Sequence, residues 1–242
     1  MQYDVLIVGG GIVGSGAARD AAMRGLKVAL IEQCDLAYGT SSRSSKLVHG
    51  GLRYLEQGEF SLVFEAVSER RVLQDIAPHL VHPLGFLFPV YKGGKLSPLT
   101  LNIGMWLYDG LSLFRSPKIH KNLSPKAVAE EEPGLIRDGL RGAQLYYDCA
   151  TNDARLTLET ALDARNHGAE IRTWTKVTGI RRDEKGRVCG VSVTDVHTGK
   201  SEDLNAHVVI NATGPWTDRP RDLVESRPAL IRPTKGVHLV VP

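Results

Sequence analysis

The sequence contains little cysteine and no long apolar run, and both shortages limit what the protein can be. Its 242 residues include three cysteines, Cys34, Cys149 and Cys189. They are far apart and form no C-x-x-C pair, so their spacing predicts neither a disulfide framework nor a zinc site. No uninterrupted apolar stretch approaches the length of a membrane-spanning helix, and Met1 leads directly into a predicted core strand, which argues against a signal peptide. We therefore expect a cytoplasmic protein with reduced thiols and no bound metal.

A strong charge of either sign is also missing. Lysine and arginine number 30 and aspartate and glutamate 27, which gives a formal net charge of +3, and no run of basic residues occurs. This near-equal number of positive and negative charges argues against nucleic acid as a partner. The small positive excess suits an anionic ligand. With 42% hydrophobic residues, the chain is long and apolar enough to bury a sizeable core.

The first 30 residues carry the pattern of a dinucleotide-binding βαβ unit. An apolar run from Tyr3 to Val8 predicts a buried strand, and the spacing Gly9-x-Gly11-x-x-Gly14 then opens a helix rich in alanine. In such a unit Gly9 permits the tight turn, Gly11 lets the backbone approach a pyrophosphate, and Gly14 allows close helix–strand contact. We expect the phosphates to lie on the helix N-terminus.

A second apolar run supports this interpretation. It extends from Val28 to Ile31 and ends in Glu32, 18 residues beyond Gly14. An acidic side chain at this place accepts hydrogen bonds from a ribose and disfavours the ribose phosphate of NADP. The glycine motif by itself leaves both NAD and FAD open.

The stretch from Thr40 to Glu56 is the most informative segment of the chain, because it combines hydroxyls, a histidine, a glycine pair and an arginine. We interpret it as a loop at the flavin half of a dinucleotide. The cofactor contacts expected from it are Thr40, Ser41, Ser42, Ser45, Lys46, Leu47, His49 and Gly50. The serines could instead cap a helix, but four hydroxyls flanking Arg43 and Lys46 suit the polar chain of the cofactor better.

The second half of the chain predicts a small antiparallel meander. Turn signals at 183–186 and 197–200 separate strands near 177–182, 188–196 and 200–205, and a buried strand then returns and ends at Ala212-Thr213-Gly214. This order is characteristic of FAD-dependent oxidoreductases with two dinucleotide-binding domains. It therefore favours FAD over NAD as the bound dinucleotide. Ala212 and Gly214 would let backbone approach the cofactor, and Lys176 and Val177 would lie at its adenine side.

The predicted fold is therefore α/β: an FAD-binding Rossmann-like (two-dinucleotide-binding) domain with an antiparallel meander and part of an α+β substrate domain. We expect residues 1–82 and 147–218 to form the FAD-binding domain, residues 83–146 a partial substrate or cap segment, and residues 219–242 the start of the substrate domain.

Residues 97–114 predict a helix with two possible uses. Ile103, Leu107, Leu111 and Phe114 recur on one face, and the ordinary interpretation is that this face packs into the core. The alternative is contact with a membrane surface, because Trp106 and Tyr108 lie in the helix and cations follow it. These cations are Arg115, Lys118 and Lys121.

Several motifs together make the sequence similar to one family. They are Gly9 to Gly14, Asp35-Leu-Ala, Thr40 to Glu56, Tyr147-Asp148-Cys149, Asp153-Ala-Arg155-Leu, Asn211-Ala-Thr-Gly-Pro-Trp216 and Lys235-Gly-Val-His238-Leu-Val-Val-Pro242. The chain resembles the FAD-dependent (aerobic) glycerol-3-phosphate dehydrogenases and their oxidase relatives over its whole length. The resemblance implies oxidation of sn-glycerol 3-phosphate to dihydroxyacetone phosphate by hydride transfer to FAD, with electrons passed to a membrane quinone.

The resemblance also implies roles for four residues. Loss of hydride from the substrate needs a cation for the phosphate and a base for the hydroxyl proton. Arg53 would bind the phosphate with Tyr54 as an added donor, His238 would act as base, and Lys235 would assist with charge. Arg53 could instead pair with Glu56 or Glu59, and His238 could be a packed histidine, so the identity of the base stays open.

The resembled family continues considerably beyond the position of Pro242. The missing parts would be the rest of the substrate-covering sheet, a further phosphate-binding arginine and a glycine-rich return segment. We therefore expect a fragment that binds FAD weakly and does not turn over, because an open site exposes hydride transfer to water. Purification of a yellow chain fully reduced by glycerol 3-phosphate would overturn this expectation.

Two other functions remain open at this point. An FAD-dependent amino acid oxidase or dehydrogenase would share the fold, and Arg53 with Tyr54 does not exclude it. A non-catalytic dinucleotide-binding module is the second, and in that case substitution of Arg53 would change no function. The sequence also leaves open whether the acceptor is quinone or oxygen, whether the chain forms a homodimer, and whether it attaches peripherally to the cytoplasmic membrane.

Overall fold

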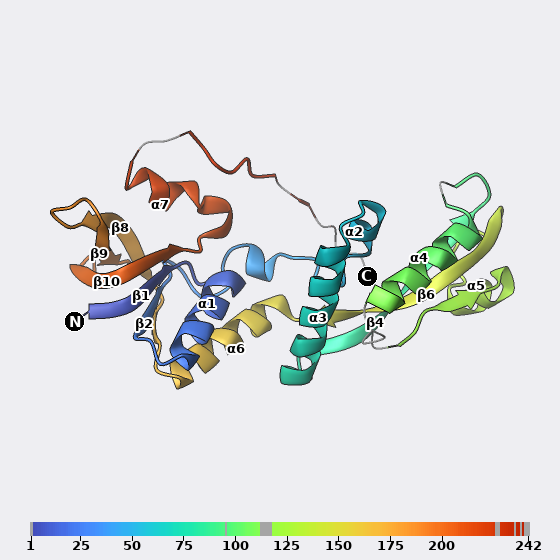
Figure 1. Ribbon diagram of the computed structural model, residues 1–242, viewed down its shortest axis with the longest axis horizontal. Helices are drawn as coiled ribbons and strands as arrows, with labels where there is room; N and C mark the ends of the chain where they lie inside the picture. The colour runs from blue at the N-terminus through green and yellow to red at the C-terminus, as the bar shows by residue number, and fades with distance from the viewer. Residues whose placement is uncertain are drawn as a thin grey trace. The chain divides into compact units, whose positions relative to one another are not determined.

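The computed structural model describes residues 2–94, 96–111, 118–225, 228–234, 236–237 and 239, and of Arg53, Glu56 and Leu111 it describes the backbone alone. The chain divides into two compact units (Figure 1). The first comprises residues 1–44 and 153–242, and the second comprises residues 45–152. Each unit is described by itself.

The first unit is built on a sheet whose described strands have the order β7-β2-β1-β10-β9-β8. The strands are β1 (Gln2–Val8), β2 (Val28–Ile31), β7 (Glu170–Arg172), β8 (Thr175–Arg182), β9 (Val188–Asp195) and β10 (Ser201–Asn211). Neighbours among β7, β2, β1 and β10 run parallel, whereas β9 and β8 continue the sheet in antiparallel orientation. The predicted βαβ unit and meander are both present.

Strand β10 corrects one expectation from the sequence. The last meander strand and the strand returning to the first sheet were expected as separate elements, near 200–205 and from 207 on. They form one continuous strand, because Asn205 pairs with Gln2 of β1 on one side and with Gly190 of β9 on the other. A single strand thus passes from the meander into the parallel part of the sheet.

Each face of this sheet has its own core. Helices α1 (Ile12–Met23) and α6 (Asp153–Asn166) lie side by side on one face (Figure 1), where Ala18 and Ala164 are completely buried. Small side chains allow helices to approach a neighbour closely, which is why the alanine-rich sequence suits this place. On the other face, Leu6 and Ile31 pack with Val191 of the meander.

The second unit is an antiparallel sheet of order β3-β6-β4, with β5 also paired to β6, and four described helices. Its strands are β3 (Leu47–Val48), β4 (Val81–Tyr91), β5 (Lys121–Leu123) and β6 (Leu140–Thr151). Its helices are α2 (Leu52–Glu56), α3 (Phe60–Ile76), α4 (Pro98–Leu111) and α5 (Pro125–Glu131). A small cluster of Val63, Val67 and Tyr108 joins α3 to α4.

The compact units differ from the expected boundaries. We expected residues 45–82 and 147–152 in the FAD-binding domain, but they cluster with residues 83–146. The physical reason is pairing: Leu47 and Val48 form a ladder with Ala150 and Cys149 of β6, and α3 packs against α4. Which of these ranges contact cofactor or substrate stays a prediction.

Helix α4 exposes the face that we expected in the core. Ile103 and Leu107 are 61% and 45% exposed, whereas Met105 and Tyr108 are buried. Leu111 and Phe114 complete the expected face, but the side chain of Leu111 and the whole of Phe114 lie outside the described residues. Arg115 also lies outside them. The periodicity predicted the helix correctly, but the helix has two apolar faces, and the face that packs is the other one.

Among the described helices, none combines the length and the apolar character needed to cross a bilayer.

Candidate functional site

The carboxyl ends of β1 and β10 meet at the glycine-rich turn. The Ala212 N–H donates to the Val8 carbonyl over 2.8 Å, and Gly9 has a left-handed φ of +113°. A Cβ atom at Gly9 would lie 2.5 Å from the Ala212 carbonyl oxygen, so the backbones leave no room for a side chain. The chain leaves β1 toward β2 on one side while β10 lies on the other, which makes this edge the switch point where open α/β sheets bind ligands.

The other two motif glycines have different surroundings. A Cβ atom at Gly14 would lie 1.9 Å from the Gly9 carbonyl oxygen, so α1 begins pressed against the turn. At Gly11, apart from the residues next to it in the chain, the only described atom within 4 Å of such a Cβ would be Ser41 Oγ at 3.2 Å. This open side and the N–H groups of the first helical turn, which have no partner within the helix, fit a pyrophosphate.

The serine-rich turn reaches the same helix end. Its start forms the short 3-10 helix η1 (Thr40–Ser42), and Ser41 Oγ accepts a hydrogen bond from the Ile12 N–H over 2.9 Å. Ser41 therefore both caps α1 and lies where the phosphates are expected. The Ser42 hydroxyl instead donates to the Gly39 carbonyl over 3.3 Å, and Thr40 is exposed.

Two backbone donors orient Glu32, the residue expected to bind the ribose. Its two carboxylate oxygens accept from the N–H groups of Gly10 at 2.7 Å and Cys34 at 2.9 Å. Each oxygen keeps a further lone pair for a ribose hydroxyl. The Thr175 N–H donates to the Glu32 carbonyl over 2.9 Å, which brings the start of β8 beside the acid, as the expected adenine side requires. The side chain of Val177 itself packs against the core.

Cys34 adjoins this acid and stays protonated. Burial, and then the charge of Glu32, raise the pKa of the Cys34 thiol above its ordinary value. A neutral thiol at this place adds no second negative charge beside Glu32, near where the ribose and phosphates are expected.

The turn after β10 closes the other side. Gly214 has a φ of +55° and begins the 3-10 helix η2 (Gly214–Trp216). Trp216 covers Gly39, where a Cβ atom would lie 2.8 Å from the indole ring. Gly39 thus has a packing reason that the sequence did not reveal, and the segment leading into η1 is held against the end of β10.

The remaining residues expected at the flavin belong to the second unit. Lys46 has a left-handed φ of +58° and leads into β3, which contains Leu47. Ser45 and His49 are exposed, whereas Gly50 is buried. These residues therefore lie in one continuous segment of the second unit. Their contact with a cofactor stays a prediction.

Gly50 lies on a buried polar cluster that sequence reasoning did not find. Asp148 Oδ1 accepts hydrogen bonds from the Gly50 N–H at 2.9 Å and the Tyr108 hydroxyl at 3.1 Å. The same oxygen forms an ion pair with Arg70, and the side chains of Arg70 and Asp148 are 0% and 5% exposed. The signal in the sequence was an aspartate in the middle of an apolar strand, between Tyr147 and Cys149.

The protonation of the cluster follows from its burial. Desolvation, and then the negative charge of Asp148, raise the pKa of Tyr108 far above its ordinary value. The same two causes raise the pKa of Tyr146 to about 12. Both tyrosines are therefore neutral near pH 7, and the Tyr108 hydroxyl keeps its proton as a donor.

The four expected catalytic residues are only partly described. Tyr54 is 37% exposed, and its ring lies against Gly51, where a Cβ atom would be 2.4 Å from it. Arg53 lies next to it in α2, but its side chain is outside the described part. Lys235 and His238 also lie outside the described residues.

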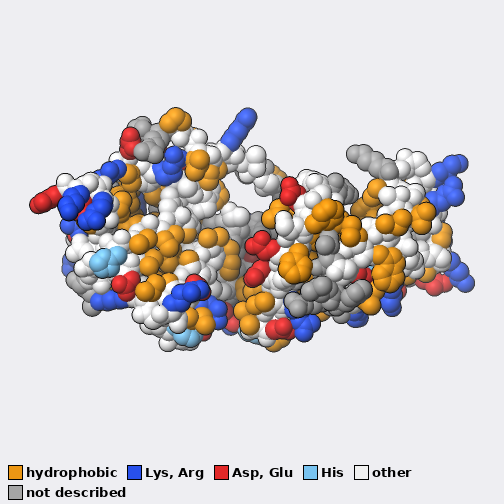
Figure 2. Space-filling model, viewed as in Figure 1, with side chains coloured by type: hydrophobic (Ala, Val, Ile, Leu, Met, Phe, Trp, Pro, Cys, Tyr) orange, Lys and Arg blue, Asp and Glu red, His pale blue; other side chains and the backbone are white. Residues whose placement is uncertain are grey.

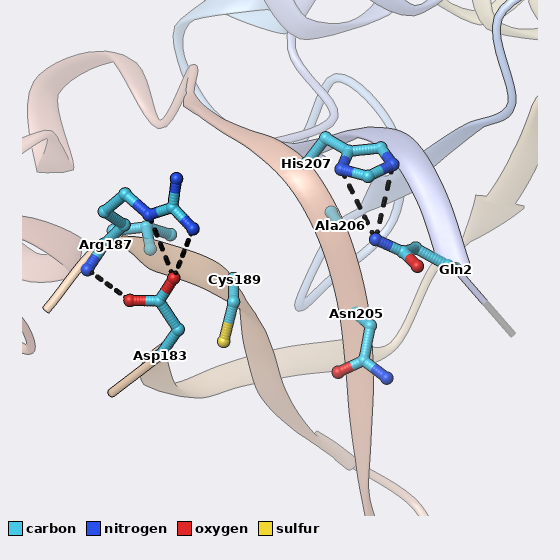
Figure 3. Close-up of a pocket in the computed structure, with 8 residues that line it drawn as sticks. Gln2, Asp183, Arg187, Cys189, Asn205, Ala206 and His207 are labelled. Carbon is cyan, nitrogen blue, oxygen red and sulfur yellow. Dashed lines mark hydrogen bonds and ion pairs between the residues drawn. The ribbon is translucent and has the colours of Figure 1, made fainter. Parts of the chain in front are cut away.

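A hollow of about 370 Å³ in the first unit lies elsewhere (Figure 3). It is lined mainly by Gln2, Asp183, Arg187, Cys189, Asn205 and His207, and its polar groups pair with each other, Asp183 with Arg187 and Gln2 with His207. Gln2 marks the amino end of β1, opposite to the glycine turn. Because parallel sheets bind ligands at their carboxyl ends, this hollow does not belong to the nucleotide site.

Comparison with known proteins assigns the family. The profile of the FAD dependent oxidoreductase (DAO) family matches residues 4–242. The chain belongs to this family. The predicted fold class and FAD as the cofactor are thereby confirmed. That the glycine turn, Ser41 and Glu32 bind this cofactor stays a prediction, with which their donors and acceptors agree.

Relatives with a large share of identical residues also agree with the resemblance drawn from the motifs. A glycerol-3-phosphate dehydrogenase of Mycobacterium leprae is 50% identical over 100% of this chain and 41% of its own length. An aerobic glycerol-3-phosphate dehydrogenase of Staphylococcus haemolyticus is 46% identical over 99% of this chain and 43% of its own. The glycerol-3-phosphate dehydrogenase of Bacillus halodurans, solved with FAD, gives a TM-score of 0.71 at 34% identity, over 93% of this chain and 37% of that one. The chain thus spans about two fifths of the length of these relatives.

Proposed function

We propose that the complete protein oxidises sn-glycerol 3-phosphate to dihydroxyacetone phosphate by hydride transfer to FAD. The observation that carries the cofactor half is the open side of Gly11 at the capped N-terminus of α1, with Glu32 held by two backbone donors nearby. The substrate half is supported by relatives that are named glycerol-3-phosphate dehydrogenases and match the whole chain.

Each part of the proposed reaction falls to particular residues of this chain. The first turn of α1 would bind the pyrophosphate, and Glu32 would hold the ribose hydroxyls. Bound FAD supplies a two-electron acceptor for the hydride. Arg53 would bind the substrate phosphate in a bidentate manner with Tyr54 as an added donor. His238 would take the hydroxyl proton, and Lys235 would assist with its charge.

The flavin spectrum tests cofactor and substrate together. We expect the complete protein to purify yellow and its visible band to bleach on anaerobic addition of glycerol 3-phosphate. Glycerol is the matched control, because it keeps the secondary hydroxyl and has a third hydroxyl in place of the phosphate, and it should bleach the band far more slowly. Bleaching by amino acids instead would point to an amino acid oxidase or dehydrogenase, and a colourless protein would point to a non-catalytic module.

We further propose that a membrane quinone receives the electrons and that α4 contacts the membrane surface. Leu99, Ile103, Trp106 and Leu107 of this helix are 68%, 61%, 53% and 45% exposed. Figure 2 displays hydrophobic side chains over the region in which Figure 1 has α4. An apolar helix face of this kind, with the cations Lys118 and Lys121 after it in the chain, suits the boundary between head groups and acyl chains.

Vesicle binding tests the membrane contact. We expect the variant Ile103→Asp/Leu107→Asp to lose about tenfold or more of its affinity for anionic phospholipid vesicles, because two apolar side chains no longer enter the lipid. Val72→Asp is the control, since Val72 is 46% exposed on α3 of the same unit. Equal binding of the two variants in a flotation assay would exclude this face of α4 as the contact.

A further inference from the structure

The buried cluster around Asp148 involves four elements of the second unit. Asp148 lies in β6, between β3 and β4 in the sheet. Arg70 comes from α3 and Tyr108 from α4, and both bind the aspartate. The fourth is the turn after β3, which contributes a backbone group. Its Gly50 N–H donates to Asp148 Oδ1 over 2.9 Å in a buried position.

Packing around Gly50 leaves no room for a side chain. A Cβ atom there would lie 1.9 Å from the Tyr108 hydroxyl oxygen and 2.6 Å from Val67 Cγ2. The turn therefore lies directly on α3 and α4, and its N–H points to the carboxylate beneath. A buried backbone donor needs a partner, and among the described residues Asp148 provides it.

The segment assigned to the substrate begins directly after Gly50. Gly51 has a left-handed φ of +70° and serves as the N-cap of α2, and α2 contains Arg53 and Tyr54. His49, expected at the flavin, comes directly before Gly50. Fixing the backbone of Gly50 therefore fixes the position from which all three side chains start.

We propose that Asp148 is a positioning residue for the proposed reaction, holding the 49–54 turn through the Gly50 N–H so that Arg53 and Tyr54 meet the substrate phosphate. This rests on the proposed function. Apolar side chains of similar volume could join α3, α4 and β6 as well as a buried ion pair does. Acceptance of a backbone N–H is the one task in this cluster that they could not perform. Arg70 balances the charge of Asp148, and Tyr108 stays a donor because its hydroxyl is neutral.

Two doubly neutral variants isolate the Gly50 contact. Arg70→Met/Asp148→Asn removes both charges and keeps an oxygen acceptor for the Gly50 N–H, whereas Arg70→Met/Asp148→Leu removes the charges and the acceptor. In the complete protein we expect the Leu variant to have a KM for glycerol 3-phosphate about tenfold above that of the Asn variant, the usual effect of one hydrogen bond. We expect kcat to differ by less than about threefold, since Arg53 and Tyr54 contact the phosphate and not the reacting carbon.

Hydrogen exchange provides a readout that does not depend on turnover. Peptides covering residues 47–56 should exchange faster in the Leu variant than in the Asn variant, while α6 should exchange equally in both. If the wild-type protein is reduced by glycerol 3-phosphate but the two variants share one KM, the positioning role is wrong. If the wild-type protein is not reduced, the proposed function fails instead, and exchange alone decides: equal exchange overturns the anchor, and faster exchange in the Leu variant supports it.

Folding of these variants needs its own safeguard. Tyr108→Phe keeps the ion pair and removes one of the three donors to Asp148, so it should fold and raise KM by a smaller factor, about twofold to threefold. If neither double variant folds, this variant decides, and an unchanged KM together with unchanged exchange of residues 47–56 would overturn the proposal.

Discussion

Replacement of Gly14 by alanine should remove FAD binding, and replacement of Gly16, two residues further along the same helix, should not. The added methyl group at Gly14 would lie 1.9 Å from the Gly9 carbonyl oxygen. That oxygen belongs to the backbone of the turn, so it cannot move aside without pulling the turn from the end of β10. We expect a loss of about 3 kcal/mol or more in the free energy of unfolding, and at least about a hundredfold in FAD affinity.

The control at Gly16 separates the clash from the loss of a glycine. Apart from its chain neighbours and the backbone of its own helix, no described heavy atom would lie within 4 Å of a Cβ at Gly16, and its helical backbone accepts alanine without strain. Alanine at this position should stabilise α1 by about 0.5 to 1 kcal/mol. Flavin content after purification and chemical denaturation measure the two effects. Equal flavin content in both variants would contradict the geometry described for the turn.

Arg70→Met should destabilise the second unit by about 3 to 5 kcal/mol, because it leaves the Asp148 carboxylate buried without a counter-ion. Arg71→Met is its neighbour and matched control. Arg71 also forms an ion pair, with Asp75 at 3.0 Å, but the two side chains are 50% and 57% exposed. An exposed i,i+4 pair of this kind contributes less than about 0.5 kcal/mol.

Urea denaturation of the complete protein, monitored by a signal from the second unit, measures this difference. The addition of Asp148→Leu to Arg70→Met should restore much of the lost stability, since the uncompensated charge is then gone. Shifts of equal size for Arg70→Met and Arg71→Met would mean that the cluster around Asp148 is open to water. Partial rescue by Asp148→Leu would show that the unpaired charge destabilises Arg70→Met. Absence of rescue would point to lost packing volume instead.

The nucleotide half of the site could be predicted from the sequence because its requirements are local. Gly9, Gly11, Gly14 and Glu32 occur at the spacing that a strand, a turn and a helix impose. The structure gives each a different surrounding, but the pattern needed no knowledge of the rest of the chain. Ser41 was also expected at the cofactor, although its contact with the Ile12 N–H was not.

The Asp148 cluster could not be predicted in this way. Its members are separated by 98 residues between Gly50 and Asp148 and by 40 between Tyr108 and Asp148. Nothing in the neighbourhood of each residue specifies the others, since an arginine in an amphipathic helix and an aspartate in a strand each have ordinary exposed alternatives. The burial of Arg70 became evident only from the packing of α3 against α4 and β4 and from its ion pair with Asp148 of β6.

Helix α4 illustrates the same limit on a smaller scale. Its sequence is apolar on two faces, so periodicity predicted the helix but could not select which face packs. The structure buries Met105 and Tyr108 and leaves Ile103 and Leu107 exposed. Continuous β10 is a further case, because the pairing of Asn205 with two different strands cannot be read from its neighbours in the chain.

The sequence by itself determined the βαβ unit, the meander, the family and the cofactor, because backbone conformation and strand–helix periodicity depend on residues near each other in the chain. Only the tertiary structure decided that the 49–54 turn lies on a buried charge, and which face of α4 is free. The reason is that burial and ion pairing depend on distances between residues far apart in sequence, and a chain acquires those distances only when it folds.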